Sequence, residues 1–253
     1  MEDPAKVMRQ FKPLLTYLSS QTGHTFQVLH NKDYAELLRR FRAGEIDLAY
    51  LGPLPYVELK TDYPEATPVV HFLESTGQAS YTCALFSSSM LNTRLGSGKT
   101  RVALTQPLST CGYLAADQLM RQLDVDLDRQ RYRYLGMHDE VALSVVRGDF
   151  DLGVAKTAIA RQYEHLGIRI VGETGRLPAF SLIANAAKMP AHDRTSVRDA
   201  LVRLRPLRSP ADADITRTWG ENIRHGAVTA QDPDFEPVRR MRGKSRIPEQ
   251  GNF

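Results

Sequence analysis

Apolar stretches of strand length alternate with stretches of helical periodicity along most of this chain. The first helical stretch has Asp3 and Pro4 at its start, and Val7, Phe11 and Leu14 recur on one face of it. Apolar stretches of strand length lie at residues 26–29, 46–51, 67–72, 81–86, 102–104, 151–155, 168–171 and 180–185. Because strands that alternate with helices usually pair in one direction, the pattern predicts an α/β fold with a parallel or mostly parallel sheet.

A helix–strand unit occurs twice with similar residues. The first copy has Asp33 as an acidic N-cap, Gly44 after the helix and a buried strand next. The second copy has Asp139 and Gly148 in the same roles. Either the copies match by chance, or the chain folds into two similar lobes. In the second case several helix starts would face one ligand site, because open α/β sheets bind ligands beyond the carboxyl ends of their strands.

Composition narrows the class of protein. The 253 residues are 42% hydrophobic and 25% charged, which is typical of a globular chain large enough for two lobes. The net charge is +4, and basic residues gather only near the end, at Arg239, Arg240, Arg242, Lys244 and Arg246. We interpret this run as a solvated end, because a nucleic-acid site needs clustered basic and aromatic side chains. We therefore expect no nucleic-acid partner.

No segment has the pattern of a membrane anchor or a targeting signal. The chain contains no apolar run near the ~20 residues of a membrane span. Its first residues do not resemble a signal peptide. We therefore expect a chain that is not embedded in a membrane, and these patterns alone give no compartment.

The run from Gln106 to Leu114 is a candidate oxyanion site. It follows a short apolar strand and contains Ser109, Thr110, Cys111 and Gly112 at the start of a helix. The first turn of a helix has backbone N–H groups without partners inside the helix, and these attract an anion together with the helix dipole. The alternative is structural, with the two hydroxyls as helix caps, Cys111 as a small core residue and Gly112 relieving crowding.

Two cysteines, Cys83 and Cys111, are too few for a disulfide framework, and no Cys or His spacing indicates a metal site. Cys83 shares a strand face with Tyr81, because side chains alternate along a strand. Cys83 is therefore a buried core thiol, a residue near the ligand site, or the partner of Cys111 in a disulfide. We expect no cofactor.

Four groups of residues, in the same order along the chain, resemble one known family. They are Asp33-Tyr34; Gly44 with residues 46–53, Tyr56 and Val57; Pro107-Leu108-Ser109-Thr110 with Gly112-Tyr113-Leu114; and His138-Asp139 with Ala142-Leu143. The chain resembles the periplasmic phosphate-, phosphite- and phosphonate-binding proteins of ABC transporters. The resemblance implies a type II periplasmic-binding-protein fold: two α/β lobes, a hinge of two crossover strands and an interlobe cleft that holds the ligand.

The resemblance also implies domain bounds and a set of ligand-binding residues. One lobe would contain residues 1–82 and 184–253, the other residues 83–183, with crossovers near residues 81–86 and 180–185. The anion would be bound by donors from both lobes: Tyr34, Tyr81, Ser109, Thr110, Gly112 and His138, with Cys111 in the position of a family serine. The tyrosines would donate O–H, and His138 would donate through either nitrogen. Without the resemblance, the tyrosines read as packing aromatics and His138 as a surface residue.

This chain departs from the family pattern in two further ways. The family has a strand before its first helix, so we expect that the recorded start lacks a leader and that strand. Family members that bind aminophosphonates have carboxylates near the ligand amine, whereas residues 156–159 and 178–182 contain no acid here. An ammonium-bearing ligand is therefore not expected.

The cysteine at position 111 decides the expected ligand. A thiol is a weaker hydrogen-bond donor than a hydroxyl, but a thiolate suits a thiophilic centre. Arsenite-binding members of the family, which report to a sensor kinase, are similar in having a cysteine in the pocket. The sequence therefore predicts a monomeric periplasmic protein that traps arsenite through Cys111 and presents it to a membrane sensor kinase.

Two other functions remain open at this point. The first is the phosphite-, phosphate- or alkylphosphonate-binding component of an ABC transporter, which would work with a permease. The second is an enzyme, with Cys111 as nucleophile, His138 as base and Asp139 as orienting residue. We do not expect an enzyme, because adjacent His and Asp side chains diverge at a helix start.

Overall fold

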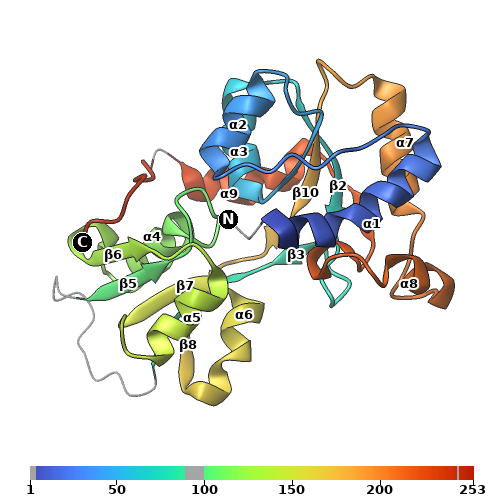
Figure 1. Ribbon diagram of the computed structural model, residues 1–253. Helices are drawn as coiled ribbons and strands as arrows, with labels where there is room; N and C mark the ends of the chain where they lie inside the picture. The colour runs from blue at the N-terminus through green and yellow to red at the C-terminus, as the bar shows by residue number, and fades with distance from the viewer. Residues whose placement is uncertain (1–3, 89–99, 244) are drawn as a thin grey trace. The chain divides into compact units, whose positions relative to one another are not determined.

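A computed structural model describes residues 4–88, 100–243 and 245–253 (Figure 1). The chain divides into two compact units. Unit 1 contains Met1–Ser80 and Pro178–Glu236, and unit 2 contains Tyr81–Leu177 and Pro237–Phe253. Among the described residues, no helix combines the length and apolar character that a bilayer crossing requires.

Unit 1 is built on a four-stranded sheet in the order β1-β10-β2-β11. The strands are β1 (Leu48–Leu51), β2 (Ala66–Phe72), β10 (Ser181–Asn185) and β11 (Ala227–Thr229). The helices of this unit are α1 (Pro4–Thr22), α2 (Tyr34–Arg42), α3 (Pro53–Asp62), α7 (Ala191–Val202) and α8 (Pro210–Thr216). Helix α1 packs on α7, and Leu18, Val70 and Val197 are completely or almost completely buried in the core beneath them.

Unit 2 is built on a five-stranded sheet in the order β6-β5-β7-β4-β8. The strands are β4 (Cys83–Ser88), β5 (Arg101–Leu104), β6 (Arg131–Tyr134), β7 (Leu152–Lys156) and β8 (Ile168–Glu173). The helices of this unit are α4 (Tyr113–Arg121), α5 (His138–Val146), α6 (Thr157–Gln162) and, from its second residue on, α9 (Glu236–Arg242). Phe86, Val141 and Val145 form the buried centre of the core of this unit.

The chain passes between the units at paired strands. Strands β3 (Ser80–Tyr81) and β9 (Leu177–Pro178) form a two-stranded sheet where the chain leaves unit 1 and returns to it. A third crossing follows Glu236, so the last residues belong to unit 2.

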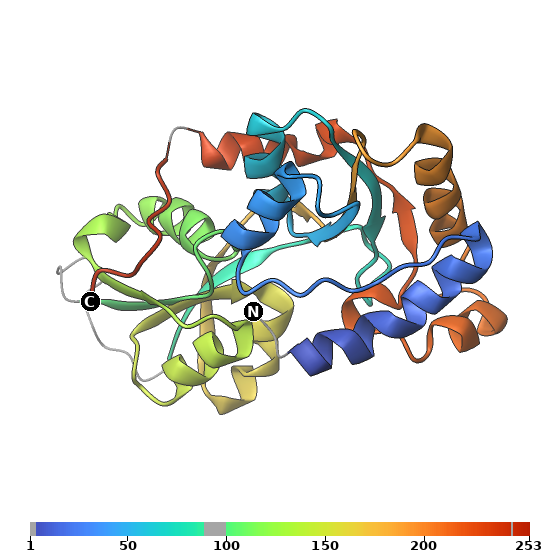
Figure 2. The ribbon, with the colours of Figure 1, turned by 45° about the horizontal axis from the view of Figure 1, so that its top comes forward.

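The C-terminal segment was expected in the lobe that contains residues 184–253, and the structure corrects this. Asn252 N–H donates to the Tyr132 carbonyl oxygen at 3.0 Å, and Tyr132 N–H donates to Asn252 Oδ1 at 2.8 Å. Figures 1 and 2 show the segment beside β6, an edge strand of the unit 2 sheet. These bonds satisfy backbone groups that an edge strand leaves open, which explains the placement.

Three other expectations about secondary structure were wrong. Residues 26–29 form no strand, because no neighbouring strand in the described part of the chain pairs with them. The sheet of unit 1 is antiparallel in all three of its pairings, and in unit 2 only β5 pairs in parallel, with β6 and with β7. Asp139 lies inside α5, whose N-cap is Met137.

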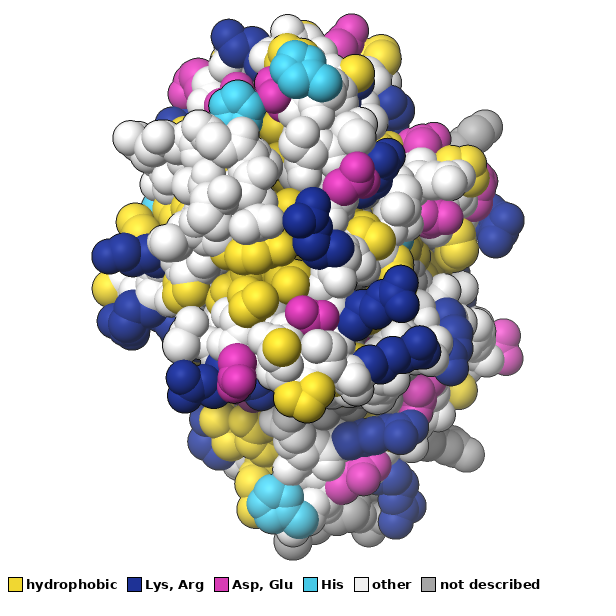
Figure 3. Space-filling model, turned by 90° about the vertical axis from the view of Figure 1, so that its right-hand side faces the viewer, with side chains coloured by type: hydrophobic (Ala, Val, Ile, Leu, Met, Phe, Trp, Pro, Cys, Tyr) yellow, Lys and Arg dark blue, Asp and Glu magenta, His cyan; other side chains and the backbone are white. Residues whose placement is uncertain are grey.

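Surface charge is mixed on the face that Figure 3 shows. Acidic side chains lie among the basic ones on this face, with hydrophobic and other side chains between them (Figure 3). A nucleic-acid interface instead presents a basic stripe or patch. This face has the distribution of an ordinary protein surface.

Candidate functional site

The candidate site lies where three strands of unit 2 end. Strand β5 pairs in parallel with β6 and with β7, so the carboxyl ends of all three strands lie at one edge of the sheet. The loops that follow β5 and β6 stay side by side, since Leu135 N–H donates to the Leu104 carbonyl at 2.8 Å and Gly136 N–H to that of Thr105 at 2.9 Å. This edge is the usual position of a ligand in an open α/β sheet.

Two consecutive turns lead from β5 into helix α4. Ser109 N–H donates to the Gln106 carbonyl at 3.0 Å, and Gly112 N–H donates to the Ser109 carbonyl at 2.9 Å. A Cβ atom at position 112 would lie 2.3 Å from the Gln106 carbonyl oxygen and 2.9 Å from that of Ser109. Only glycine fits here without a shift of the backbone.

The first turn of α4 presents backbone donors. The first helical hydrogen bond runs from Ala116 N–H to the Gly112 carbonyl at 3.1 Å, which leaves the three preceding N–H groups of the helix without intrahelical partners. Gly112 is the N-cap, and as a glycine it has no side chain that could cap the helix. The Ser109 hydroxyl is partly exposed and makes no hydrogen bond within the described residues, while Thr110 is 3% exposed. The Ser109 hydroxyl therefore caps no helix within the described residues.

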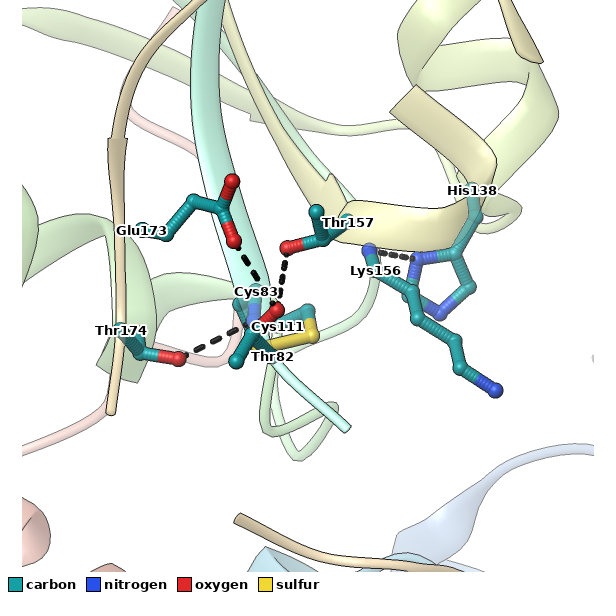
Figure 4. The surroundings of a disulfide bond; sticks show 8 residues. All are labelled: Thr82, Cys83, Cys111, His138, Lys156, Thr157, Glu173 and Thr174. Atoms are coloured by element: carbon teal, nitrogen blue, oxygen red, sulfur yellow. Dashed lines mark hydrogen bonds between the residues drawn. A yellow bond between two sulfur atoms is a disulfide. The ribbon is translucent and has the colours of Figure 1, made fainter. Parts of the chain in front are cut away.

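His138 is the first residue of α5, and a backbone bond fixes its orientation. Its Nδ1 accepts the N–H of Lys156 at 3.0 Å (Figure 4). Burial, and then the positive charge of Lys156, lower the pKa of His138 to about 4. The ring is therefore neutral at pH 7 with its proton on Nε2, so this nitrogen is the one that donates.

Lys156 is a member of the site that the sequence did not single out. It ends β7, directly before α6, and its ammonium nitrogen lies 5.4 Å from the centroid of the Tyr81 ring. Tyr81 is 8% exposed and stands two residues before Cys83. The position of a lysine at the carboxyl end of a predicted strand was the signal that could have identified it. Lys156 adds a positive charge beside His138 and Tyr81.

Cys83 and Cys111 form a disulfide, with their Cα atoms 5.2 Å apart. Both residues are buried, with exposed fractions of 0% and 1%, and neither cysteine is free. The pairing that the sequence left open is therefore present. A disulfide sulfur has no thiolate to bond arsenic, so Cys111 is not available as an arsenic ligand in this disulfide form, and its part in the ligand site stays a prediction. Within the described ranges, no group of three or more His, Cys, Asp or Glu side chains is arranged to hold a metal.

The predicted site residues thus divide between the units. Tyr81, Ser109, Thr110, Cys111, Gly112 and His138 all belong to unit 2, around the carboxyl ends of its parallel strands. Tyr34 belongs to unit 1, where it opens α2 directly after the N-cap Asp33. Burial raises the pKa of the Tyr34 phenol to about 12, so it stays an O–H donor at neutral pH. Its part in the site stays a prediction.

The contacts also argue against the catalytic arrangement. Cys111 has no thiol to act as nucleophile, and His138 Nδ1 is bonded to a backbone N–H. Asp139 accepts the Tyr163 hydroxyl at 3.0 Å. A nucleophile–base–carboxylate series is therefore absent from these residues.

Comparisons with known proteins agree with this geometry. A family model described as "ABC transporter, phosphonate, periplasmic substrate-binding protein" matches residues 1–235. The chain is 25% identical to the phosphate-import protein PhnD of Mycolicibacterium smegmatis, over 95% of this chain and 82% of that protein. The fold is similar to PhnD1 of Prochlorococcus marinus, solved with methylphosphonate, with a TM-score of 0.78, 14% identity and coverage of 96% and 94% of the two chains. It is also similar to the binding protein of a Pseudomonas aeruginosa phosphonate ABC transporter, with a TM-score of 0.75, 16% identity and coverage of 95% and 82%.

The fold is that of two-lobed α/β periplasmic binding proteins. The chain belongs to the family of periplasmic substrate-binding proteins of phosphonate ABC transporters. Members of this family bind and deliver a solute and are not enzymes. A periplasmic location follows from the family.

Proposed function

We propose that this protein binds a small tetrahedral oxyanion of phosphorus (phosphate, phosphite or a simple alkylphosphonate) and delivers it to the permease of an ABC importer. The supporting observation is the convergence of donors at one edge of the unit 2 sheet. The turn before α4 and the Nε2–H of the neutral His138 both stand there. Uncharged donors and a helix start bind an oxyanion without an arginine.

The charges around this edge favour an anion over an ammonium-bearing ligand. Lys156 is a cation at the end of β7. The carboxylate of Glu173 already accepts Arg161 at 2.9 Å and the Thr82 hydroxyl at 3.2 Å. An aminophosphonate needs a carboxylate for its ammonium group, and burying a charge without a partner is costly. The ligand is therefore expected to be a phosphorus oxyanion without an amine.

The names of the relatives point to the same ligand class. The mycobacterial relative is a phosphate-import protein, and the Prochlorococcus protein was solved with methylphosphonate. The arsenite function rested on one thiolate, which the Cys83–Cys111 disulfide removes. No observation supports a sensor kinase as partner.

A ligand panel tests this function. Phosphate, phosphite, methylphosphonate, 2-aminoethylphosphonate, sulfate and arsenite are added separately, and calorimetry and thermal unfolding are measured. A phosphorus oxyanion at a hundred times its Kd should add about 2.7 kcal/mol of stability. Ser109→Ala should weaken binding, whereas Ser196→Ala should not, because its hydroxyl bonds the His192 carbonyl on α7. Binding of arsenite alone, or of no phosphorus oxyanion, would refute the proposal.

A further inference from the structure

The disulfide joins two segments that are far apart in the sequence and adjacent in the site. Cys111 stands inside the turn that Ser109 and Gly112 close, directly before α4. Cys83 is the first residue of β4, and the two cysteines are 28 residues apart in sequence. The turn that presents the anion donors is therefore covalently attached to the sheet.

The Cys83 end of this bond is held on both sides. Its N–H donates to Thr174 Oγ1 at 3.0 Å, and its carbonyl accepts the Thr174 N–H at 2.9 Å. The Oγ1 atom of the preceding residue, Thr82, lies 2.7 Å from Oγ1 of Thr157, within hydrogen-bond distance. Figure 4 shows these residues around the disulfide. These bonds hold Cys83 in place, and the disulfide attaches the turn of residues 109–112 to it.

The same point is connected to His138. Cys83 is the register partner of Lys156 across the antiparallel pair β4–β7, and Lys156 N–H donates to His138 Nδ1. The series runs from the turn through the disulfide to Cys83, and then through Lys156 to His138. The turn of residues 109–112 and His138, which both offer hydrogen-bond donors, are thereby attached to the same pair of strands.

Burial indicates that this bond is a permanent brace and not a redox switch. Thiol–disulfide exchange requires a thiolate to reach a sulfur atom. Both cysteines are almost completely buried, at 0% and 1% exposure. A soluble reductant or another protein therefore reaches the bond only slowly, when this part of the chain opens locally.

We propose that the Cys83–Cys111 disulfide is a positioning element that holds the turn of residues 109–112 at a fixed place relative to His138, while the Cys111 side chain gives the ligand no hydrogen bond. This inference rests on the proposed function. A site ordered before binding has less conformational entropy to lose, so the brace strengthens binding of the anion. The proposal also assigns a physical role to Cys111, which stands where the family motif has a serine.

Two double variants distinguish positioning by the disulfide from hydrogen-bond donation by the side chain at position 111. Cys83→Ala/Cys111→Ala removes the bond, and Cys83→Ser/Cys111→Ser removes the bond but supplies a hydroxyl at position 111. Both should bind phosphate or methylphosphonate about tenfold more weakly than the wild type, with faster dissociation. Wild-type affinity in the alanine variant would overturn the proposal. Recovery of affinity in the serine variant alone would also overturn it, because a side-chain donor would then be what matters.

A measurement without ligand completes the test. Hydrogen exchange should show faster exchange of the amides of residues 109–114 in both variants, with the strand amides of β5 and β6 unchanged. A uniform rise across unit 2 would indicate general destabilisation and contradict a positioning role. If a variant does not fold, wild-type protein slowly reduced by a phosphine, with two thiols confirmed by mass, replaces it. If the oxidised wild type binds no oxyanion, the proposed function fails, and the exchange pattern still decides whether the bond positions the turn.

Discussion

The backbone N–H of Lys156 donates a hydrogen bond of 3.0 Å to Nδ1 of His138. A main-chain donor cannot lose its proton, so Nδ1 must stay unprotonated as long as this bond persists. The neutral ring therefore carries its proton on Nε2. In the proposed function, His138 would be a hydrogen-bond donor of fixed direction.

Two substitutions at position 138 separate acceptance of the Lys156 N–H by Nδ1 from donation by Nε2. The amide oxygen of His138→Asn reaches the place of Nδ1 and can accept the Lys156 N–H, but it leaves no donor at Nε2. The longer His138→Gln places an amide N–H near Nε2. We expect His138→Gln to keep more of the oxyanion affinity than His138→Asn, which should lose about tenfold or more, as for one lost hydrogen bond to a charged group. Calorimetric titration with phosphate and methylphosphonate measures this, and equal affinities would contradict the role of Nε2.

The stability of the protein should fall in mild acid because of His138. Its pKa is lowered to about 4 in the folded chain, by burial and then by Lys156, while an unfolded histidine titrates near 6.5. As the pH falls, His138 binds a proton in the unfolded chain before it does so in the folded chain. The free energy of unfolding is therefore highest above pH 6.5 and decreases as the pH falls toward 4. The loss should be on the order of 2 kcal/mol. Denaturant unfolding at pH 7 and pH 4.5 measures it, with His138→Asn as the control that should show a smaller pH dependence.

Burial lowers the pKa of His138 most, and Lys156 should lower it further. The positive charge of Lys156 disfavours a second positive charge on the imidazole. Lys156→Met removes the charge and keeps the backbone N–H, so the pKa of His138 should rise toward its ordinary value. Lys156→Arg retains the charge and should leave the pKa low. An NMR titration of the His138 ring gives both values, and an unchanged pKa in Lys156→Met would show that burial alone lowers it.

Apolar stretches were sufficient to predict most strands, but they failed where a strand depends on its pairing partner. Residues 67–72 and 180–185 form β2 and β10 nearly as predicted, because each strand contains a short buried apolar run, residues 69–70 in β2 and 182–184 in β10. Strand β6 was missed, since Arg131 and Arg133 alternate with tyrosines and interrupt the apolar pattern of this edge strand. Residues 26–29 had a strand composition without a partner strand. Local pattern therefore predicts a strand only where the rest of the fold provides a neighbour.

Only part of the candidate site was predicted, because the other part depends on how the strands pair. The turn of residues 109–112 and His138 are visible in the sequence, because each stands at a predicted helix start. The disulfide and the part played by Lys156 depend on the register of β4 against β7, which places Cys83 opposite Lys156. Strand register depends on which strands become neighbours, so the pattern within one segment does not predict it.

Gly112 should not tolerate a side chain. A Cβ atom there would lie 2.3 Å from the Gln106 carbonyl oxygen, so Gly112→Ala must displace the turn before α4. We expect a loss of about 1–3 kcal/mol in the free energy of unfolding and weaker oxyanion binding. Gly175→Ala is the matched control, because nothing lies within 4 Å of its added Cβ. Equal stability of the two variants in denaturant unfolding would show that the turn has room to adjust.

The C-terminal segment should protect the edge of the unit 2 sheet. It lies beyond the residues 1–235 that the family model matches. Asn252 makes two reciprocal bonds with Tyr132, and its Nδ2 donates to the Gln130 carbonyl at 2.8 Å. Arg133 stacks over the Phe253 ring, with its guanidinium carbon 4.7 Å from the ring centroid. The tail thus occupies the hydrogen-bonding groups of β6 that would otherwise attract another strand.

Removal of residues 248–253 should therefore destabilise the protein and promote its self-association. Asn252→Ala removes two side-chain bonds and should cost about 1–2 kcal/mol in the free energy of unfolding. Gln250→Ala is the control, because Gln250 is exposed and no hydrogen bond involves its side chain within the described residues. Denaturant unfolding gives the stabilities, and analytical ultracentrifugation gives the oligomeric state. A truncated protein that stays monomeric at high concentration would show that the bare β6 edge does not recruit a second copy.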